Sequence, residues 1–135
     1  MKKAFHLLLP SLLFTLLLFT SCEKSKDTLL YGRWNVVKTD VCGDVVTYPN
    51  GTGDVYRFRS DHTYSITNKG TNVAEGEWEF NEEAGTLTLW SDPDNNISAT
   101  YNVDVLEEES LILGFDFGFL FGEVELARDH SAQPR

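Results

Sequence analysis

Apolar and polar residues alternate in short runs along most of the chain, and turn-forming residues separate the runs. In the run "TYNVDV", Tyr101, Val103 and Val105 share one parity, and the asparagine and aspartate between them share the other. Successive side chains of a β-strand point to opposite faces, so this period of two predicts strands with one buried and one wet face. No segment has a sustained apolar period of 3.6, and we therefore expect very little helix.

Eight such runs predict eight β-strands. Strands joined by short connections either close on themselves or leave exposed edges that invite aggregation. We therefore expect an all-β fold, a small eight-stranded antiparallel up-and-down barrel, after an N-terminal signal segment. A sandwich of two sheets is the alternative. The predicted strands span residues 34–39, 54–59, 63–67, 73–80, 86–90, 98–106, 110–115 and 119–128.

Four phenylalanines alternate with other residues in "GFDFGFLFG", residues 114–122. One straight strand here would place two of them on the same face as Glu123 and Glu125, and one face cannot be both core and solvent-exposed. We therefore predict a hairpin loop over 116–118 with Gly118 in the left-handed conformation, and a β-bulge at Gly122. Phe115 then points inward, and the candidates for an apolar rim at one end of the barrel are Phe117, Phe119 and Phe121.

The N-terminus has a different pattern. Lys2 and Lys3 precede an apolar stretch over 7–19, which is shorter than the ~20 residues of a membrane span and predicts a secretory signal peptide. The run "FTSC" ending at Cys22 resembles the lipobox of bacterial lipoproteins, with Phe19 where Leu is commoner. The resemblance implies that Cys22 is acylated, for example with palmitate, and that the protein is exported and lipid-anchored in the bacterial envelope, at the outer membrane. An ordinary secreted protein is the alternative.

These patterns divide the chain into four segments. We expect a lipoprotein signal peptide over 1–21, a flexible tether over 22–29, a barrel over 30–129 and a disordered tail over 130–135. About 100 residues in the barrel segment allow one domain with a core of modest size.

The charge of the chain argues against some partners. Lys and Arg number 11 against 21 Asp and Glu, a net charge of −10. Without Lys2 and Lys3 the balance is 9 − 21 = −12. Such a surface repels nucleic-acid phosphates and anionic lipid headgroups, so we expect no nucleic-acid partner and contact with a membrane through the lipid anchor alone.

The residues that carry catalysis or bind metals are sparse. His62 is the one histidine within the predicted barrel, so neither a Ser-His-Asp triad nor a metal site is expected. We predict no enzymatic activity and no cofactor. The "DPDNN" run over 92–96 lacks the turn glycine and bidentate glutamate of a calcium loop and is interpreted as a hairpin turn, and the "EEE" run over 107–109 as a solvated turn.

The second cysteine, Cys42, is alone if Cys22 carries lipid. No histidine or basic residue adjoins it in the sequence, so we interpret it as an unreactive thiol. A disulfide between Cys22 and Cys42 is the alternative, and it would exclude the lipoprotein interpretation.

Several short motifs occur in an order and spacing that resemble those of bacterial lipocalin-like domain lipoproteins, within the calycin and lipocalin group. They are the G-x-W at Gly32 and Trp34, "FRSDHTY" over 58–64, "GEW" over 76–78 and "LARD" over 126–129. The resemblance implies that Trp34 plugs the closed end of the barrel and that Arg128 lies across it. His62 replaces the glycine of the family hairpin and must therefore tolerate positive φ.

Two functions follow as hypotheses. The resemblance implies binding of a small hydrophobic ligand, and small eight-stranded barrels can hold one such molecule. The alternative is a barrel filled by its own side chains that acts as a structural or protein-interaction module of the cell envelope without a small-molecule ligand. The candidate ligand-lining residues are Tyr56, Phe58, Tyr64, Trp78, Tyr101, Leu113 and Phe115.

Overall fold

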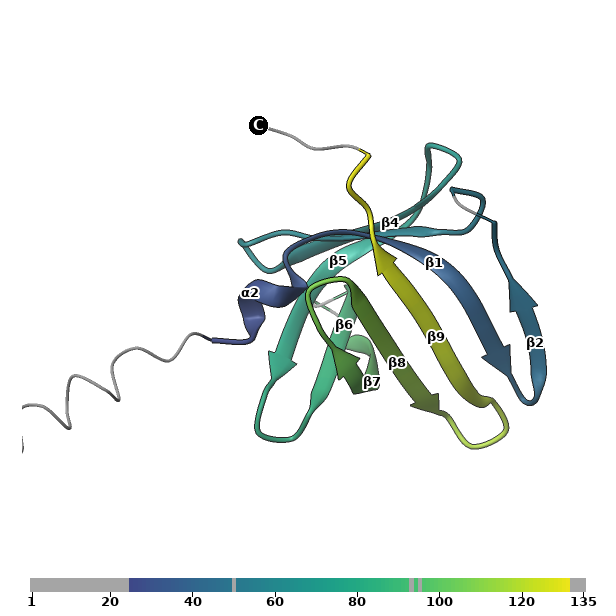
Figure 1. Ribbon diagram of the computed structural model, residues 1–135. Coiled ribbons are helices and arrows are strands. Elements are labelled where there is room, and N and C mark those ends of the chain that lie inside the picture. Colours follow the sequence, from purple (N-terminus) through teal and green to yellow (C-terminus); the bar gives the residue numbers. More distant parts are fainter. Residues whose placement is uncertain (1–24, 50, 93, 95, 132–135) are drawn as a thin grey trace, which may run out of the picture.

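A computed structural model describes residues 25–49, 51–92, 94 and 96–131. Within this part of the chain there are nine β-strands and one short helix (Figure 1). The elements are α2 (Asp27–Leu30), β1 (Gly32–Val41), β2 (Asp44–Thr47), β3 (Val55–Phe58), β4 (Thr63–Asn68), β5 (Thr71–Asn81), β6 (Thr86–Asp92), β7 (Ile97–Leu106), β8 (Ser110–Asp116) and β9 (Phe121–Arg128).

Eight of the strands, β1 and β3 to β9, form a closed antiparallel barrel. Each pairs with the next in chain order, and β9 returns to pair with β1 along residues 122–128. Closure leaves none of these eight strands as a long free edge, which is the physical reason for the barrel prediction. The predicted up-and-down barrel is therefore confirmed, and the alternative of a two-sheet sandwich is wrong.

The strand β2 is the one that the hydrophobic pattern did not predict. Cys42 and Gly43 both have positive φ, of 53° and 87°, and form a tight turn that folds β2 back on the end of β1. β3 pairs with the first half of β1, and β2 pairs with the second half of the same edge. All four residues of β2 are exposed, so its side chains carry little burial signal for sequence analysis to detect.

The barrel has two ends of different construction. At the closed end, where β1 begins, α2 packs against the barrel and Leu30 is completely buried. The open end is defined by the turns β1–β2, β4–β5, β6–β7 and β8–β9. In Figure 1, α2 lies at the left, whereas the β1–β2 and β8–β9 turns lie together at the lower right.

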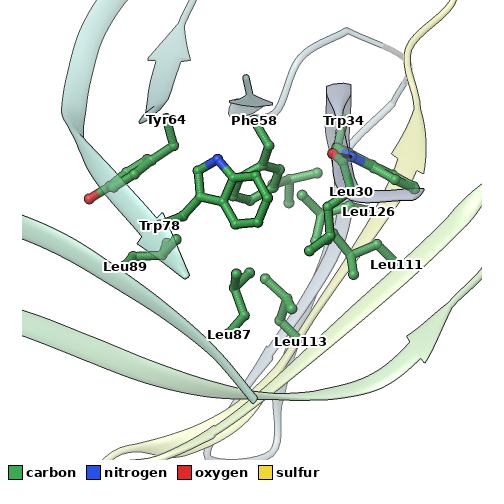
Figure 2. Close-up of a cluster of buried hydrophobic side chains, with 11 residues drawn as sticks. Leu30, Trp34, Phe58, Tyr64, Trp78, Leu87, Leu89, Leu111, Leu113 and Leu126 are labelled. Carbon is green, nitrogen blue, oxygen red and sulfur yellow. Dashed lines mark hydrogen bonds between the residues drawn. The ribbon is translucent and has the colours of Figure 1, made fainter. Parts of the chain in front are cut away.

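A cluster of buried side chains fills the barrel at the closed end and extends from there toward the open end. Its largest members are Trp34, Trp78 and Phe58, each at most 2% exposed. Figure 2 shows the Trp78 ring near the middle of this cluster. The remaining members are Leu30, Val36, Tyr64, Leu87, Leu89, Leu111, Leu113 and Leu126. Burial of this many large apolar side chains provides most of the stabilising free energy that a domain of this size can gain.

The ends of the domain differ from the expected boundaries. Residues 27–29 belong to α2 instead of a flexible tether, because burial of Leu30 and a hydrogen bond to the Leu29 carbonyl hold them against the barrel. At the other end, His130 lies 2.7 Å from a Glu109 carboxylate oxygen, so the tail does not begin at residue 130. The predicted signal peptide, Cys22 and residues 132–135 lie outside the described residues. No helix within the described ranges is long and apolar enough to cross a membrane.

The β8–β9 turn bears out part of its prediction. Gly118 has φ of 91°, and its N–H is bonded to the Asp116 carboxylate. The loop spans 117–120, however, and β9 begins at Phe121 instead of Phe119. The predicted bulge at Gly122 is wrong, because the β8–β9 register runs through it without a shift. Glycine is required there for another reason, since a Cβ would lie 1.8 Å from the Asp40 carbonyl oxygen.

Candidate functional site

Two stacked side chains, Trp34 from the first strand and Arg128 from the last, seal the closed end of the barrel. The guanidinium carbon of Arg128 lies 4.0 Å from the centre of the Trp34 ring system. The indole N–H of Trp34 donates to the Leu30 carbonyl, at 3.0 Å. Gly32 lies beside the pair, where a Cβ would come within 3.0 Å of the guanidinium. This is the arrangement that the family resemblance implied, and a cation over an indole contributes about 0.5–2 kcal/mol.

Backbone carbonyls bind the rest of the Arg128 side chain. Its guanidinium donates to the carbonyls of Tyr31, at 2.6 Å, Leu29, at 2.7 Å, and Glu108, at 2.9 Å. Desolvation by burial lowers the pKa of Arg128, and the nearby Glu109 and Glu108 oppose the shift. The acidic turn over 107–109 is therefore more than a solvated tip, because it anchors the C-terminal end of the domain.

Four of the expected ligand-lining residues belong to the packed core. Phe58, Tyr64, Trp78 and Leu113 are each at most 4% exposed. The Phe58 and Trp78 rings meet edge to face with centres 5.8 Å apart, which is a favourable aromatic geometry. These side chains fill the interior at the closed end instead of lining a cavity there.

The other three candidates, Tyr56, Tyr101 and Phe115, are half-buried. Tyr101 and Phe115 contact Phe117 of the β8–β9 turn, whereas Tyr56 lies opposite Trp34 in the strand register. Desolvation raises the pKa of the Tyr56 phenol above its usual value, and the neighbouring Tyr101 adds to the shift. Burial also raises the pKa of Tyr101 and of Tyr64, again with Tyr101 contributing to the latter. The three phenols are thus neutral neighbours inside the barrel, and none of them has a hydrogen-bond partner within the described part of the chain.

Small residues occupy several inward positions nearest the open end. The strand register places Ala74 opposite Ile66 and Ala99 opposite the inward Leu89, and Gly122 shares the parity of Val124. The two alanines and Gly122 are only half-buried. These inward positions are therefore more exposed than the buried core at the closed end.

An apolar rim surrounds this end. It comprises all eight large hydrophobic residues that are exposed in the described chain, and each lies in β2, near the start of β5, β7 or β9, or in the β8–β9 turn. Phe119 is 91% exposed and Phe121 is 51% exposed. Sequence analysis found three of the eight and missed five, because single apolar residues at strand ends have no periodic signal. The rim consists of Val45, Val46, Val73, Ile97, Phe117, Phe119, Leu120 and Phe121.

The rim is continuous with the half-buried aromatic residues beneath it. Phe117 stacks on Phe115 with ring centres 5.5 Å apart, and both rings meet Tyr101 edge to face. The backbone N–H of Cys42 donates to the Phe121 carbonyl, at 2.8 Å, and ties the β1–β2 turn to the β8–β9 turn. Surface and interior aromatic groups therefore form one apolar surface at the open end.

The histidine in the β3–β4 turn has a structural place. His62 has φ of 68°, as its position in the hairpin required. Its ring stacks on Trp78 with centres 4.4 Å apart, and its Nδ1 lies 3.3 Å from the Trp78 carbonyl. Within the described ranges, no three His, Cys, Asp or Glu side chains are grouped so that they could hold a metal ion.

A separate groove of about 680 Å³ lies on the outside of the barrel. None of the seven expected ligand-lining residues contributes to it. Its walls come from the outer faces of β1, β3 and β4, from the loop before β3, from the β4–β5 turn and from residues 128–131.

Comparisons with known proteins agree on the fold alone. No protein-family model matches the chain, and no curated protein matches its sequence. Among solved structures, a lipocalin-like protein from Bacteroides uniformis is similar, with a TM-score of 0.55 and 14% sequence identity. The match covers 75% of this chain and 99% of that chain. The protein therefore has the fold of a lipocalin-like β-barrel.

Proposed function

We propose that this protein is an exported, lipid-anchored barrel that binds a small hydrophobic ligand at its open end. The observation that supports the proposal is the asymmetry of the apolar surface. All eight exposed large hydrophobic residues of the described chain form the rim, and they continue inward through Phe115 and Tyr101. Exposed apolar patches of this kind commonly mark binding sites.

The filled closed end limits the size of the ligand. Because Trp34, Phe58 and Trp78 occupy the interior at that end, a ligand reaches only the half-buried aromatic layer near the open end. The binding site is therefore shallow, and much of the ligand contacts the rim. The neutral phenols of Tyr56 and Tyr101 offer hydrogen bonds to a polar group on an otherwise apolar molecule.

The proposed lipid anchor would orient the barrel so that its open end points away from the membrane. Cys22 precedes Lys26 by four residues, which span at most about 14 Å when extended. The ten-residue strand β1 is roughly 33 Å long and runs from the α2 end to the rim. A lipid on Cys22 thus holds the closed end near the bilayer and leaves the rim free to receive a ligand.

Ligand binding can be tested on residues 22–135 carrying Cys22→Ser. The probes are palmitate and the neutral fluorophore N-phenyl-1-naphthylamine. A ligand at 100 times its dissociation constant stabilises the folded state by about 2.7 kcal/mol, so the thermal midpoint should rise by several degrees. Phe117→Ser should weaken the response, whereas Ile112→Ala, an outward-facing change away from the rim, should not. The absence of any response across an apolar panel would contradict the proposal.

Anchoring has its own test. The full chain should fractionate with membranes, and Cys22→Ser should release it because a single modified residue supplies all of the proposed attachment. Retention of the variant in the membrane fraction would contradict the anchor while leaving ligand binding to be judged separately.

One observation favours a second candidate function, a protein-docking module. Phe119 is almost fully exposed, and β2 has no partner on its outer edge within the described sheet. An open strand edge beside apolar side chains suits the addition of a strand from another protein. In this case Phe119→Ser should abolish recovery of an envelope partner, and apolar small molecules should leave the thermal midpoint unchanged.

A further inference from the structure

The outer groove has a polar character unlike that of the rim. Arg33 and Asn35 of β1, Val55 of β3 and Thr67 of β4 contribute to it from strand positions that point away from the barrel interior. Figure 1 shows that the chain after β9, up to residue 131, leaves the barrel on the same side as the β4–β5 turn. The volume of about 680 Å³ is typical of small-molecule sites.

Arg33 has an unsatisfied donor in this groove. Its Nε is buried and has no hydrogen-bond partner among the described residues. The nearest acid is Asp129, whose Oδ2 lies 3.6 Å away, beyond hydrogen-bond distance. Buried polar groups in folded proteins are almost always paired, so the protein itself satisfies this charged side chain only in part.

The Asp129 carboxylate already accepts hydrogen bonds from residues other than Arg33. Its side chain is 6% exposed, and its Oδ1 accepts hydrogen bonds from the backbone N–H of Ser131, at 2.9 Å, and from its hydroxyl, at 2.6 Å. Asn35 also donates to this carboxylate. Asp129 therefore holds Arg33 in position without satisfying it. The Arg33 side chain is 37% exposed and lines the groove.

Positive charge is concentrated around Arg33 although the chain as a whole carries −10. The strand register places Arg57 directly opposite Arg33 on the outer face, and like charges at such a position repel each other. Arg57 forms no ion pair with any residue that the structure describes. Lys69 adds an ammonium group from the β4–β5 turn. An anion in the groove would reduce this repulsion.

The remaining lining can bind hydroxyl groups. It includes the polar side chains of Asn35 and Thr67 and the backbone of Gly51, Gly53 and Gly70, and none of the described residues that line it is a phenylalanine, tyrosine or tryptophan. We propose that this groove binds a small hydroxyl-bearing oxyanion, a sugar carboxylate or sugar phosphate, whose anionic group is held between the Arg33 guanidinium and the Lys69 ammonium. Charge-assisted hydrogen bonds of this kind are the strongest that such a site can offer.

The glycine amides provide a direct test. Amide NMR spectra of the full-length ¹⁵N-labelled chain in detergent micelles would be recorded during titration with glucuronate, with glucose 6-phosphate and with neutral glucose. Signals of Gly51, Gly53 and Gly70 should shift with one or both anions and not with glucose, and the anion that binds more tightly identifies the source of the oxyanion. Gly85 and Gly118, outside the groove, should not move.

Substitutions of Arg33 and Lys69 test whether anion binding in the groove depends on these two cationic side chains. Arg33→Gln should weaken binding by at least about tenfold, and Lys69→Asn by a few fold, since asparagine tolerates the positive φ of this position. Lys38→Gln, on β1 outside the groove, is the matched control and should change nothing. If Arg33→Gln fails to fold, two measurements still test whether binding is electrostatic: the affinity of Lys69→Asn, and the affinity of the unchanged protein in added sodium chloride, which should fall. Unshifted groove glycines, equal shifts with glucose, or unchanged affinity in both groove variants would overturn the proposal.

Discussion

The two ends of the barrel use the same class of side chain in opposite ways. At the closed end, Trp34 is completely buried beneath Arg128, and α2 covers the interior. At the open end, Phe119 is 91% exposed, and no helix of the described residues covers the β8–β9 turn. Aromatic character alone therefore does not separate core from surface in this fold. What separates them is whether a segment from elsewhere in the chain covers that end.

The cover at the closed end depends on contacts between segments far apart in sequence. Arg128 binds carbonyls at Leu29 and Tyr31, roughly a hundred residues earlier, and the carbonyl of Glu108 in the β7–β8 turn. Such a cap is cooperative, because each hydrogen bond requires that the others hold the side chain in place. The open end has a weaker tie, the hydrogen bond from Cys42 to Phe121, and stays accessible.

The largest expected effect comes from removing the plug itself. Trp34→Ala should lower the free energy of unfolding by about 3–5 kcal/mol, because it deletes a fully buried indole and leaves a cavity. Trp90, a half-buried outward-facing tryptophan of β6, provides the matched control, and Trp90→Ala should cost clearly less. Urea denaturation of both variants measures the difference. Equal losses would show that the closed end is not the main source of stability.

The cap should be next in size. Arg128→Met keeps most of the apolar stem but removes the donors to three carbonyls, and we expect a loss of about 1.5–3 kcal/mol in the same assay. Arg57→Met, at an exposed position of β3, should change stability by less than about 0.5 kcal/mol. A cap variant as stable as the control would mean that water satisfies these carbonyls equally well.

The tyrosines inside the barrel predict a loss of stability in alkali. Burial raises the pKa of Tyr56 in the folded state, so above about pH 10 the unfolded chain loses this proton before the folded chain does. The contribution is fully present below pH 10 and falls by about 1.4 kcal/mol per pH unit above it. Tyr56→Phe should flatten the decline measured by urea denaturation between pH 9 and 11. An unchanged slope would indicate that Tyr56 ionises as easily in the folded protein.

The smallest stability effect is expected at the rim. Phe119→Ser should change the free energy of unfolding by less than about 0.5 kcal/mol, because the ring is almost wholly exposed before the change. Self-association or adhesion to apolar surfaces, measured by light scattering, should fall in the variant. A loss above 1 kcal/mol would contradict the contrast, since it would mean that the rim is packed like the closed end.

The period of two along the strands was enough to predict the barrel and its inward faces. It placed Phe58, Trp78 and Leu113 correctly on the inward side, because alternation on a half-buried strand is a local property. The left-handed conformations at Gly118 and His62 were predictable for the same reason, since turn chemistry depends on a few adjacent residues.

Other features required contacts that no local pattern contains. The conformation of α2, the burial of Asp129 and the hold of the 107–109 turn on Arg128 all depend on residues distant in sequence. The sequence by itself thus determined the class of fold, the strand faces and the acidic charge of the chain. The tertiary structure decided which end is sealed, which aromatic residues stay exposed and where positive charge gathers outside the barrel, because closure of the sheet brings these distant residues together.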